Sequence, residues 1–146
     1  MSKRTRAREI VLKCLYAYET LEKEAKTIFE ETCAKTKLDT KSTEFASNLY
    51  SAVTEKLEEI DKEISSNAVN WNIDRFAIVD KNIMRMAVCE LFYFPDIPAK
   101  VSINEAIELA KKYSTMDSSS FVNGILDAIY RKNIVELEEK GKVRAE

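Results

Sequence analysis

The chain has 146 residues, of which 45% are hydrophobic and 33% are charged, with only two Gly, two Pro and no His. This length suits one domain with a sizeable core, and so few Gly and Pro leave little material for the tight turns of an all-β fold. The lack of His excludes Ser-His-Asp and Cys-His catalytic pairs, and the widely separated Gly124 and Gly141 exclude a glycine-rich phosphate loop. We therefore expect an all-α protein without catalytic residues, metal or cofactor.

Apolar residues that recur at three- and four-residue steps predict helices in the first half of the chain. These patterns run over 3–20, 22–35 and 44–70. The third pattern is either one bent helix or two helices joined near 54–57. The periodicity resets around 70–74, which places a boundary there between an N-terminal half of about 3–70 and a C-terminal half of about 74–133.

Three further helical patterns follow, over about 75–94, 102–113 and 117–131. The first is apolar on most sides, which is typical of a central helix. Ser102 and Glu105 form a capping-box pattern at the start of the second. Asp117 is the expected N-cap of the last helix, which extends toward a frayed tail at 134–146. Gly124 inside this helix costs about 1 kcal/mol relative to Ala, and we interpret it as a close approach of another helix.

Three widely spaced cysteines, Cys14, Cys33 and Cys89, show no CxxC spacing. Such cysteines are typical of reduced core residues rather than of a disulfide framework or a zinc site. No apolar run is long enough to span a membrane, and the N-terminus lacks the apolar segment of a signal peptide. We accordingly expect a cytoplasmic protein without a membrane partner.

The net charge of −2 conceals two unlike parts. Residues 1–13 hold five basic side chains and one acidic side chain, a net charge of +4, and the remaining 133 residues carry −6. A basic helix start on an acidic body suggests a polyanionic partner, and a solvated segment that aids solubility is the alternative. Because cations at a helix N-terminus oppose the macrodipole, their presence there points to a use.

The cations of this segment form an array suited to phosphates. Arg4 and Arg8 share one helix face, and Arg6 and Lys13 share another. Each phosphate contact with a single strand adds about −0.7 to the slope of log K against log salt, so Lys3 and the three arginines together predict a slope of about −3.

A second candidate site is the polar turn before the last helix, where Asp117 is followed by three serines and Phe121. Hydroxyls and N–H groups at a helix start can hold a nucleic-acid backbone or base edges, with Phe121 stacking on a base. Periodicity alone favours the alternative, in which the turn caps the helix and Phe121 belongs to the core.

Charged residues of the central helix are a third candidate: Asp80, Lys81, Arg85 and Glu90. Paired carboxylates can transfer protons to and from a substrate. No pocket signature or His accompanies them, so an internal pair between an Arg and a carboxylate is the favoured interpretation.

Four segments carry a likeness to a known family. They are RARE at 6–9, DKNIMRMA at 80–87, DIPAKVSINEAIELAK at 96–111 and FVNGILD at 121–127. In order and spacing they resemble the NusB transcription antitermination factors over about residues 3–133. The last two segments in combination are highly specific, whereas the Arg-rich start alone is not.

The resemblance implies a fold of two small helical bundles packed together, with about six to seven helices within 1–133. It also implies binding of single-stranded boxA RNA of ribosomal RNA operons together with NusE, a small-subunit ribosomal protein. The pair would join other Nus factors in an antitermination complex on RNA polymerase, with the protein itself a monomer or a homodimer.

Motif positions also imply where RNA binds. The expected RNA-binding residues, with Lys3 added from the charge pattern, are Lys3, Arg4, Arg6, Arg8, Asp117 and Phe121. Asp80 and Lys81 are expected to face the RNA or the partner. Thr5 interrupts the Arg run that family members often carry, which predicts weaker RNA affinity without the partner.

Two other classes of function compete with this hypothesis. NusB-like domains also occur at the N-terminus of ribosomal RNA cytosine methyltransferases, and this chain would then be the RNA-recruiting fragment of such an enzyme. A purely protein-binding helical module, whose basic helix start meets an acidic protein, is the other alternative.

Overall fold

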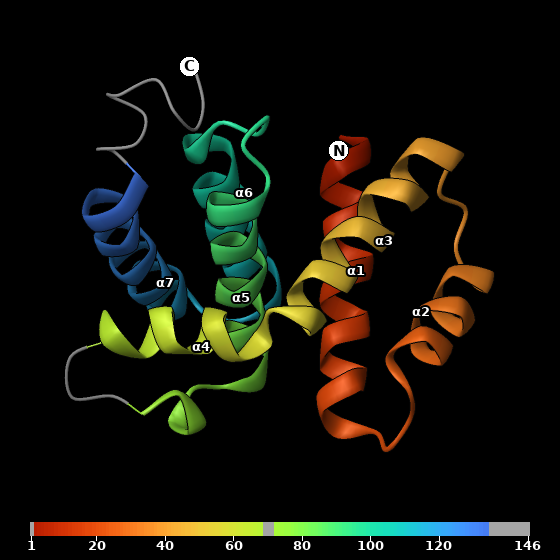
Figure 1. The fold of residues 1–146 in the computed structure, drawn as a ribbon, viewed down its shortest axis with the longest axis horizontal. Coiled ribbons are helices and arrows are strands. Elements are labelled where there is room, and N and C mark those ends of the chain that lie inside the picture. The colour runs from red at the N-terminus through yellow and green to blue at the C-terminus, as the bar shows by residue number, and fades with distance from the viewer. Residues whose placement is uncertain (1, 69–71, 135–146) are drawn as a thin grey trace. The chain divides into compact units, whose positions relative to one another are not determined.

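The computed structural model describes residues 2–68 and 72–134, and every regular element within these ranges is helical. The first elements are α1 (Lys3–Thr20), α2 (Ala25–Ala34) and α3 (Thr40–Glu55). The elements that follow are α4 (Leu57–Ser66), the 3₁₀ turn η1 (Ile73–Arg75), α5 (Ile78–Tyr93), α6 (Ala99–Tyr113), α7 (Met116–Ile129) and the π-helical turn η2 (Tyr130–Ile134) (Figure 1). The all-α class predicted from the sequence is confirmed. The chain divides into two compact units, Met1–Glu55 and Lys56–Glu146.

In the first unit, α1 packs against both α2 and α3 (Figure 1). Ser2 begins the helix: its hydroxyl accepts a hydrogen bond from the N–H of Thr5 at 3.0 Å. The predicted apolar stripe of α1 is buried except at Tyr18, and Ala7, Val11 and Cys14 have no exposed surface. Burial of this stripe, rather than helix propensity, holds α1 in place.

Helix α2 has fewer buried residues than α1. Of its residues only Ile28 is buried. Tyr50 of α3 anchors it, because its hydroxyl donates to the carbonyl of Ala25 at 2.8 Å and its ring stacks on Phe29 with the centroids 5.5 Å apart. The side of α2 that faces α1 therefore retains open space, which is described below as a groove.

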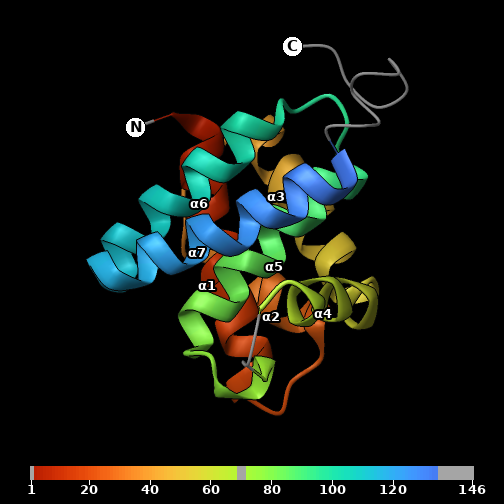
Figure 2. The same ribbon diagram turned by 90° about the vertical axis from the view of Figure 1, so that its left-hand side faces the viewer.

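In the second unit, α5 is the central helix, and every residue from Asp80 to Leu91 is buried. Helices α6 and α7 pack against each other and against α5 (Figure 2). Helix α4 also packs against α5 through its buried Ile60 and Ile64. The prediction of a central helix is therefore confirmed.

The pattern over 44–70 forms two helices, α3 and α4. The break lies at Lys56, whose φ of −105° and ψ of 17° leave the helical region. The division between the units at this point precedes the boundary predicted at 70–74, because α4 packs against α5 and α7 of the second unit. Residues 69–71 of the predicted boundary and 135–146 of the predicted tail lie outside the described residues.

The capping-box prediction at Ser102 is wrong, because α6 begins at Ala99 with Pro98 as its N-cap. Ser102 lies inside the helix, is 2% exposed, and donates to Oε1 of Glu90 at 2.7 Å. A buried carboxylate requires such donors, so tertiary pairing with α5 explains this serine. The interpretation of Gly124 also fails, because a Cβ added there would meet nothing within 4 Å.

Candidate nucleic-acid interface

The first expected RNA contact, Lys3, already has a partner in the first unit. Its Nζ lies 2.9 Å from Oδ2 of Asp39, which precedes α3. The hydrogen bond from Lys3, with a second from the N–H of Ser42, holds the pKa of Asp39 well below its usual range. The same contact raises the pKa of Lys3. Asp39 therefore competes with any phosphate for Lys3.

Arg4 and Arg8 lie over the same aromatic ring. Their guanidinium carbons are 4.5 Å and 5.2 Å from the ring centroid of Phe45 in α3. Arg4 is exposed and can reach a ligand from this position, whereas Arg8 is 3% exposed and makes further contacts within the molecule. The sequence expectation that Arg8 presents its charge to RNA therefore disagrees with its burial, which its packing against Phe45 explains.

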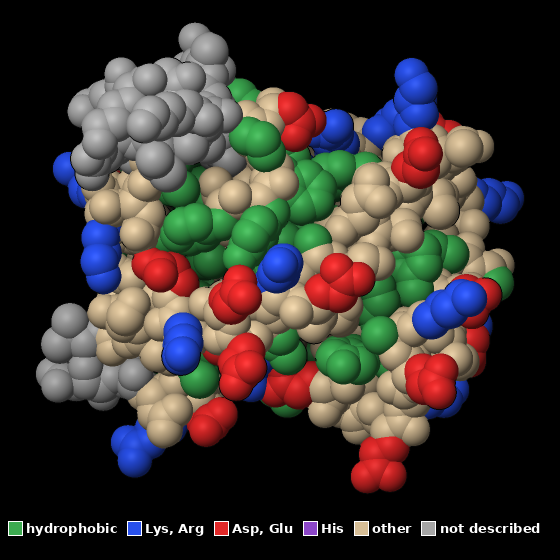
Figure 3. Space-filling model, in the orientation of Figure 1, with side chains coloured by type: hydrophobic (Ala, Val, Ile, Leu, Met, Phe, Trp, Pro, Cys, Tyr) green, Lys and Arg blue, Asp and Glu red, His purple; other side chains and the backbone are tan. Residues whose placement is uncertain are grey.

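Arg6 is the most accessible arginine of this helix start. It is exposed, and it has no ion-pair partner among residues 2–68 and 72–134. Lys and Arg side chains gather on the surface where α1 begins (Figure 3). Arg6 and Arg4 are thus the two arginines whose charge this surface offers to a polyanion.

The start of α7 in the second unit is built by hydroxyl groups. Thr115 is the N-cap: its side chain accepts from the N–H of Ser118 at 3.0 Å. The prediction of Asp117 as the cap is wrong, because Asp117 lies exposed in the first turn, where a carboxylate favours the helix dipole. Ser118 donates to Oδ2 of Asp80 at 2.8 Å and so joins α7 to α5.

A pocket of about 250 Å³ lies beside this junction. Its lining residues are Arg75, Phe76, Ala77, Asp80, Asp117, Ser118 and Phe121. The structure thus brings Asp80 of one candidate site together with Asp117 and Phe121 of another. The rings of Phe76 and Phe121 meet edge to face, with centroids 5.2 Å apart and planes at 89°.

Asp80 is the unusual group of this pocket. Its side chain is 6% exposed, and while Oδ2 accepts from Ser118, Oδ1 has no hydrogen-bond partner in the described part of the chain. An unpaired buried acceptor costs about 1–3 kcal/mol, and more when charged. A ligand that donates a hydrogen bond here would remove that cost.

The other charged residues of α5 are occupied internally. Arg85 forms a two-pronged pair with Asp61 of α4, with both N–O distances 2.7 Å, which confirms the predicted internal Arg–carboxylate pair. Glu90 accepts from Ser102 in α6. Lys81 is 7% exposed and makes contacts within the molecule, which disagrees with the expectation that it faces RNA or a partner.

Three residues of the pocket were not recognised as functional from the sequence: Arg75, Phe76 and Ala77. Phe76 lies in extended backbone between η1 and α5, where no helical spacing relates it to Asp80, whereas Ser118 and Phe121 are three residues apart on one face of α7. The link between the two segments spans 38 residues from Asp80 to Ser118, and no local pattern encodes it.

Other kinds of site find little support in the described ranges. Within them, no group of three or more His, Cys, Asp or Glu side chains is placed to hold a metal ion. None of the described helices is long and apolar enough to cross a membrane. Burial raises the pKa of the free thiols Cys14 and Cys89 to about 11 and about 12, so both stay protonated and unreactive near neutral pH.

Comparisons with known sequences identify the family. Residues 5–131 match the model of the NusB family. The transcription antitermination protein NusB of Chloroherpeton thalassium is 45% identical over 94% of this chain, which spans 64% of that relative's length. The protein of the same name from Thermodesulfovibrio yellowstonii is 42% identical, over 90% of this chain and 94% of its own length.

Solved structures give the same result. NusB of T. maritima is 35% identical, with a TM-score of 0.85 over 96% of this chain and 98% of its own. A chain from the crystal structure of the antitermination factors NusB and NusE with double-stranded RNA is 28% identical, with a TM-score of 0.83 over 90% of this chain and 98% of its own. The resemblance found in the sequence is confirmed: the chain belongs to the NusB family.

Proposed function

We propose that this protein is a transcription antitermination factor that binds boxA RNA of ribosomal RNA operons together with NusE. In this role it helps to assemble a complex with other Nus factors on RNA polymerase, and it catalyses no reaction. Two findings support the proposal: the relatives are named transcription antitermination proteins, and a similar NusB chain occurs in a complex with NusE and RNA.

The pocket beside α7 is the observation that carries the proposal. Carboxylates repel phosphates, but they accept hydrogen bonds from base amino groups, as Asp and Glu do from the N4 group of cytosine. Asp117 is exposed at the pocket, and Asp80 has an oxygen without a partner in the described chain. Phe121, partly exposed beside them, supplies a ring on which an unpaired base can stack. The pocket therefore suits the bases of a single strand.

The start of α1 supplies the complementary function. Arg4 and Arg6 are exposed, and neither forms an ion pair with an acidic residue of the described chain. Contacts from these arginines to phosphates attract any RNA, whatever its sequence. Lys3 can add a contact only by leaving Asp39. We therefore assign capture to α1 and base recognition to the pocket beside α7.

Fluorescence anisotropy with labelled boxA RNA and a scrambled strand of equal length tests the proposal, with and without NusE. We expect boxA to bind more tightly than the scrambled strand, and NusE to increase the difference. Equal binding of the two strands in the presence of NusE would overturn the proposed function.

A further inference from the structure

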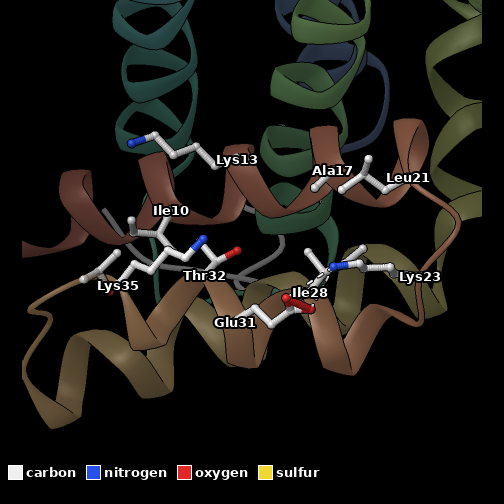
Figure 4. A pocket seen from close by; sticks show the side chains of 10 residues that line it. Ile10, Lys13, Ala17, Leu21, Lys23, Ile28, Glu31, Thr32 and Lys35 are labelled. Atoms are coloured by element: carbon white, nitrogen blue, oxygen red, sulfur yellow. Dashed lines mark hydrogen bonds and ion pairs between the residues drawn. The ribbon is translucent and has the colours of Figure 1, made fainter.

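A groove between α1 and α2 continues from the basic start of α1. One part, of about 370 Å³, is lined by Arg6, Glu9, Ile10, Lys13, Lys35, Thr36, Lys37 and Leu38. The next part, of about 390 Å³, shares Ile10, Lys13, Lys35 and Thr36 with it and extends to Leu21 and Lys23 (Figure 4). Because the two parts share four residues, they form one groove, which we call the α1–α2 groove.

Positive charge dominates the end of this groove nearest Arg6. Arg6, Lys13, Lys35 and Lys37 are all exposed, and none has an ion-pair partner within residues 2–68 and 72–134. The single carboxylate of this part, Glu9, is partly buried and makes contacts of its own. The lining of this part therefore holds four cations and one acid.

The far end of the groove carries no net charge. Lys23 lies 3.1 Å and 3.2 Å from the two carboxylate oxygens of Glu31, so the two charges cancel (Figure 4). Aliphatic side chains line the space beside this pair, among them Ile10, Ala17 and Ile28. The unbalanced charge is therefore confined to the end that Arg6 shares with the proposed capture surface.

The geometry points to a track for the RNA backbone: we propose that a segment of the strand flanking boxA lies along the α1–α2 groove, with its phosphates on Lys13, Lys35 and Lys37. This inference rests on the proposed RNA-binding function and extends its footprint. Arg6 and Lys13 are seven residues apart, so they lie on one face of α1 about 10.5 Å apart along its axis. Lys13 thus continues the row of cations that Arg6 begins.

An acidic protein segment is the competing occupant, and two observations favour RNA. The groove is continuous with the helix start to which RNA capture is assigned, through Arg6 itself. Its cations also lie on both sides of the groove, two on α1 and two in the segment that follows α2, so a chain with a phosphate at every residue can contact both sides. Contacts of this kind are independent of sequence, so the flanking segment needs no defined bases.

The test compares boxA RNA alone with boxA RNA carrying about ten extra uridines at its 5′ or 3′ end, across a salt series with NusE present. Three added phosphate contacts would steepen the slope of log K against log salt by about 2 for one of the two extensions. With that slope, the factor by which the extension increases RNA affinity grows about 130-fold as salt falls from about 1 M to about 0.1 M. The double variant Lys13→Gln/Lys35→Gln should remove about 1.4 of the added slope and leave binding of the unextended RNA unchanged.

Lys26→Gln is the matched control, because Lys26 is exposed on α2 but lines a separate groove with Phe29 and Tyr50. It should alter neither RNA. If neither extension steepens the slope while unextended boxA binds, the groove is not an RNA track, and the proposed function is unaffected. Weaker NusE binding by the double variant without RNA, and no effect on the extended RNA, would assign the groove to a protein instead. Failure of unextended boxA to bind would overturn the proposed function, and the inference with it.

Discussion

At the start of α1 the exposed cations Lys3 and Arg4 are paired or stacked and Arg6 is open to solvent. Beside α7, in contrast, a carboxylate is buried with one oxygen left without a partner in the described chain. Lys3 holds Asp39 at 2.9 Å, and Arg4 lies over Phe45. Asp80 is 6% exposed and accepts one hydrogen bond, from Ser118. The first arrangement is stable by itself and attracts any polyanion; the second is completed only by a donor of suitable shape. The comparison therefore assigns affinity for any RNA to the start of α1 and specificity for particular bases to the pocket beside α7.

Phe121→Leu should have the largest effect on this comparison, because it removes the stacking ring but keeps apolar packing against Phe76. Loss of one base–aromatic stack costs about 1–3 kcal/mol, which weakens boxA binding by about 5- to 150-fold. The salt slope should not change. Anisotropy measures both quantities, and circular dichroism verifies the fold. Unchanged boxA affinity would assign Phe121 to the structure of α7 rather than to RNA.

The double variant Arg4→Gln/Arg6→Gln should have the next largest effect. Two lost phosphate contacts reduce the salt slope by about 1.4. As salt falls from about 1 M to about 0.1 M, the variant therefore gains about 25-fold less affinity than the unchanged protein. The loss should be equal for boxA and scrambled RNA. Lys62→Gln, an exposed lysine of α4, is the control and should leave the slope unchanged. Arg8 is unsuitable here, because its burial against Phe45 couples it to stability.

Asp39→Asn should strengthen RNA binding modestly. Asn keeps the acceptor for the N–H of Ser42 but releases Lys3, which can then add about 0.7 to the slope, or about fivefold in affinity between about 1 M and about 0.1 M salt. The pH dependence of the free energy of unfolding provides an independent check of the Lys3–Asp39 pair. Because the pKa of Asp39 is lowered in the folded state, its stabilising contribution is full above the unfolded value of about 3.9 and is lost as pH falls through the lowered value. An NMR titration of Asp39 that shows an ordinary pKa would contradict the Lys3 pair.

Gly124→Ala should have the smallest effect and should act on stability only. A Cβ at this position of α7 meets nothing within 4 Å, and Ala is the better helix former by about 0.8–1 kcal/mol. Urea unfolding should therefore show an increase of about that size. Destabilisation would mean that another segment approaches α7 at this point.

Much of the fold could be predicted from the sequence, because apolar periodicity reports local helices directly. The helix expected over 3–20 coincides with α1. Ser102 was misplaced, since its local pattern is that of a cap while its hydroxyl pairs with Glu90 in another helix. Local patterns compete with tertiary contacts, and only the folded chain decides between them.

The candidate site was less predictable for the same reason. Asp80 and Phe121 were candidates from the residue pattern and from family motifs, but the hydrogen bond from Ser118 and the packing of Phe76 on Phe121 join segments that are far apart in the sequence. The burial of Arg8 depends on Phe45, 37 positions away in the sequence. Charge along a helix predicts a basic surface, but it does not tell which cations that surface exposes.

The division between capture and recognition is tested most directly by measuring the boxA-to-scrambled affinity ratio and the salt slope for two variants, with NusE present. Asp80→Asn keeps the size of the side chain and an acceptor for Ser118, but it replaces the second acceptor with a donor. We expect Asp80→Asn to lower the ratio and keep the slope, and Arg4→Gln/Arg6→Gln to lower the slope and keep the ratio. If both variants change the same quantity, or Asp80→Asn changes neither, capture and recognition are not separated in this way.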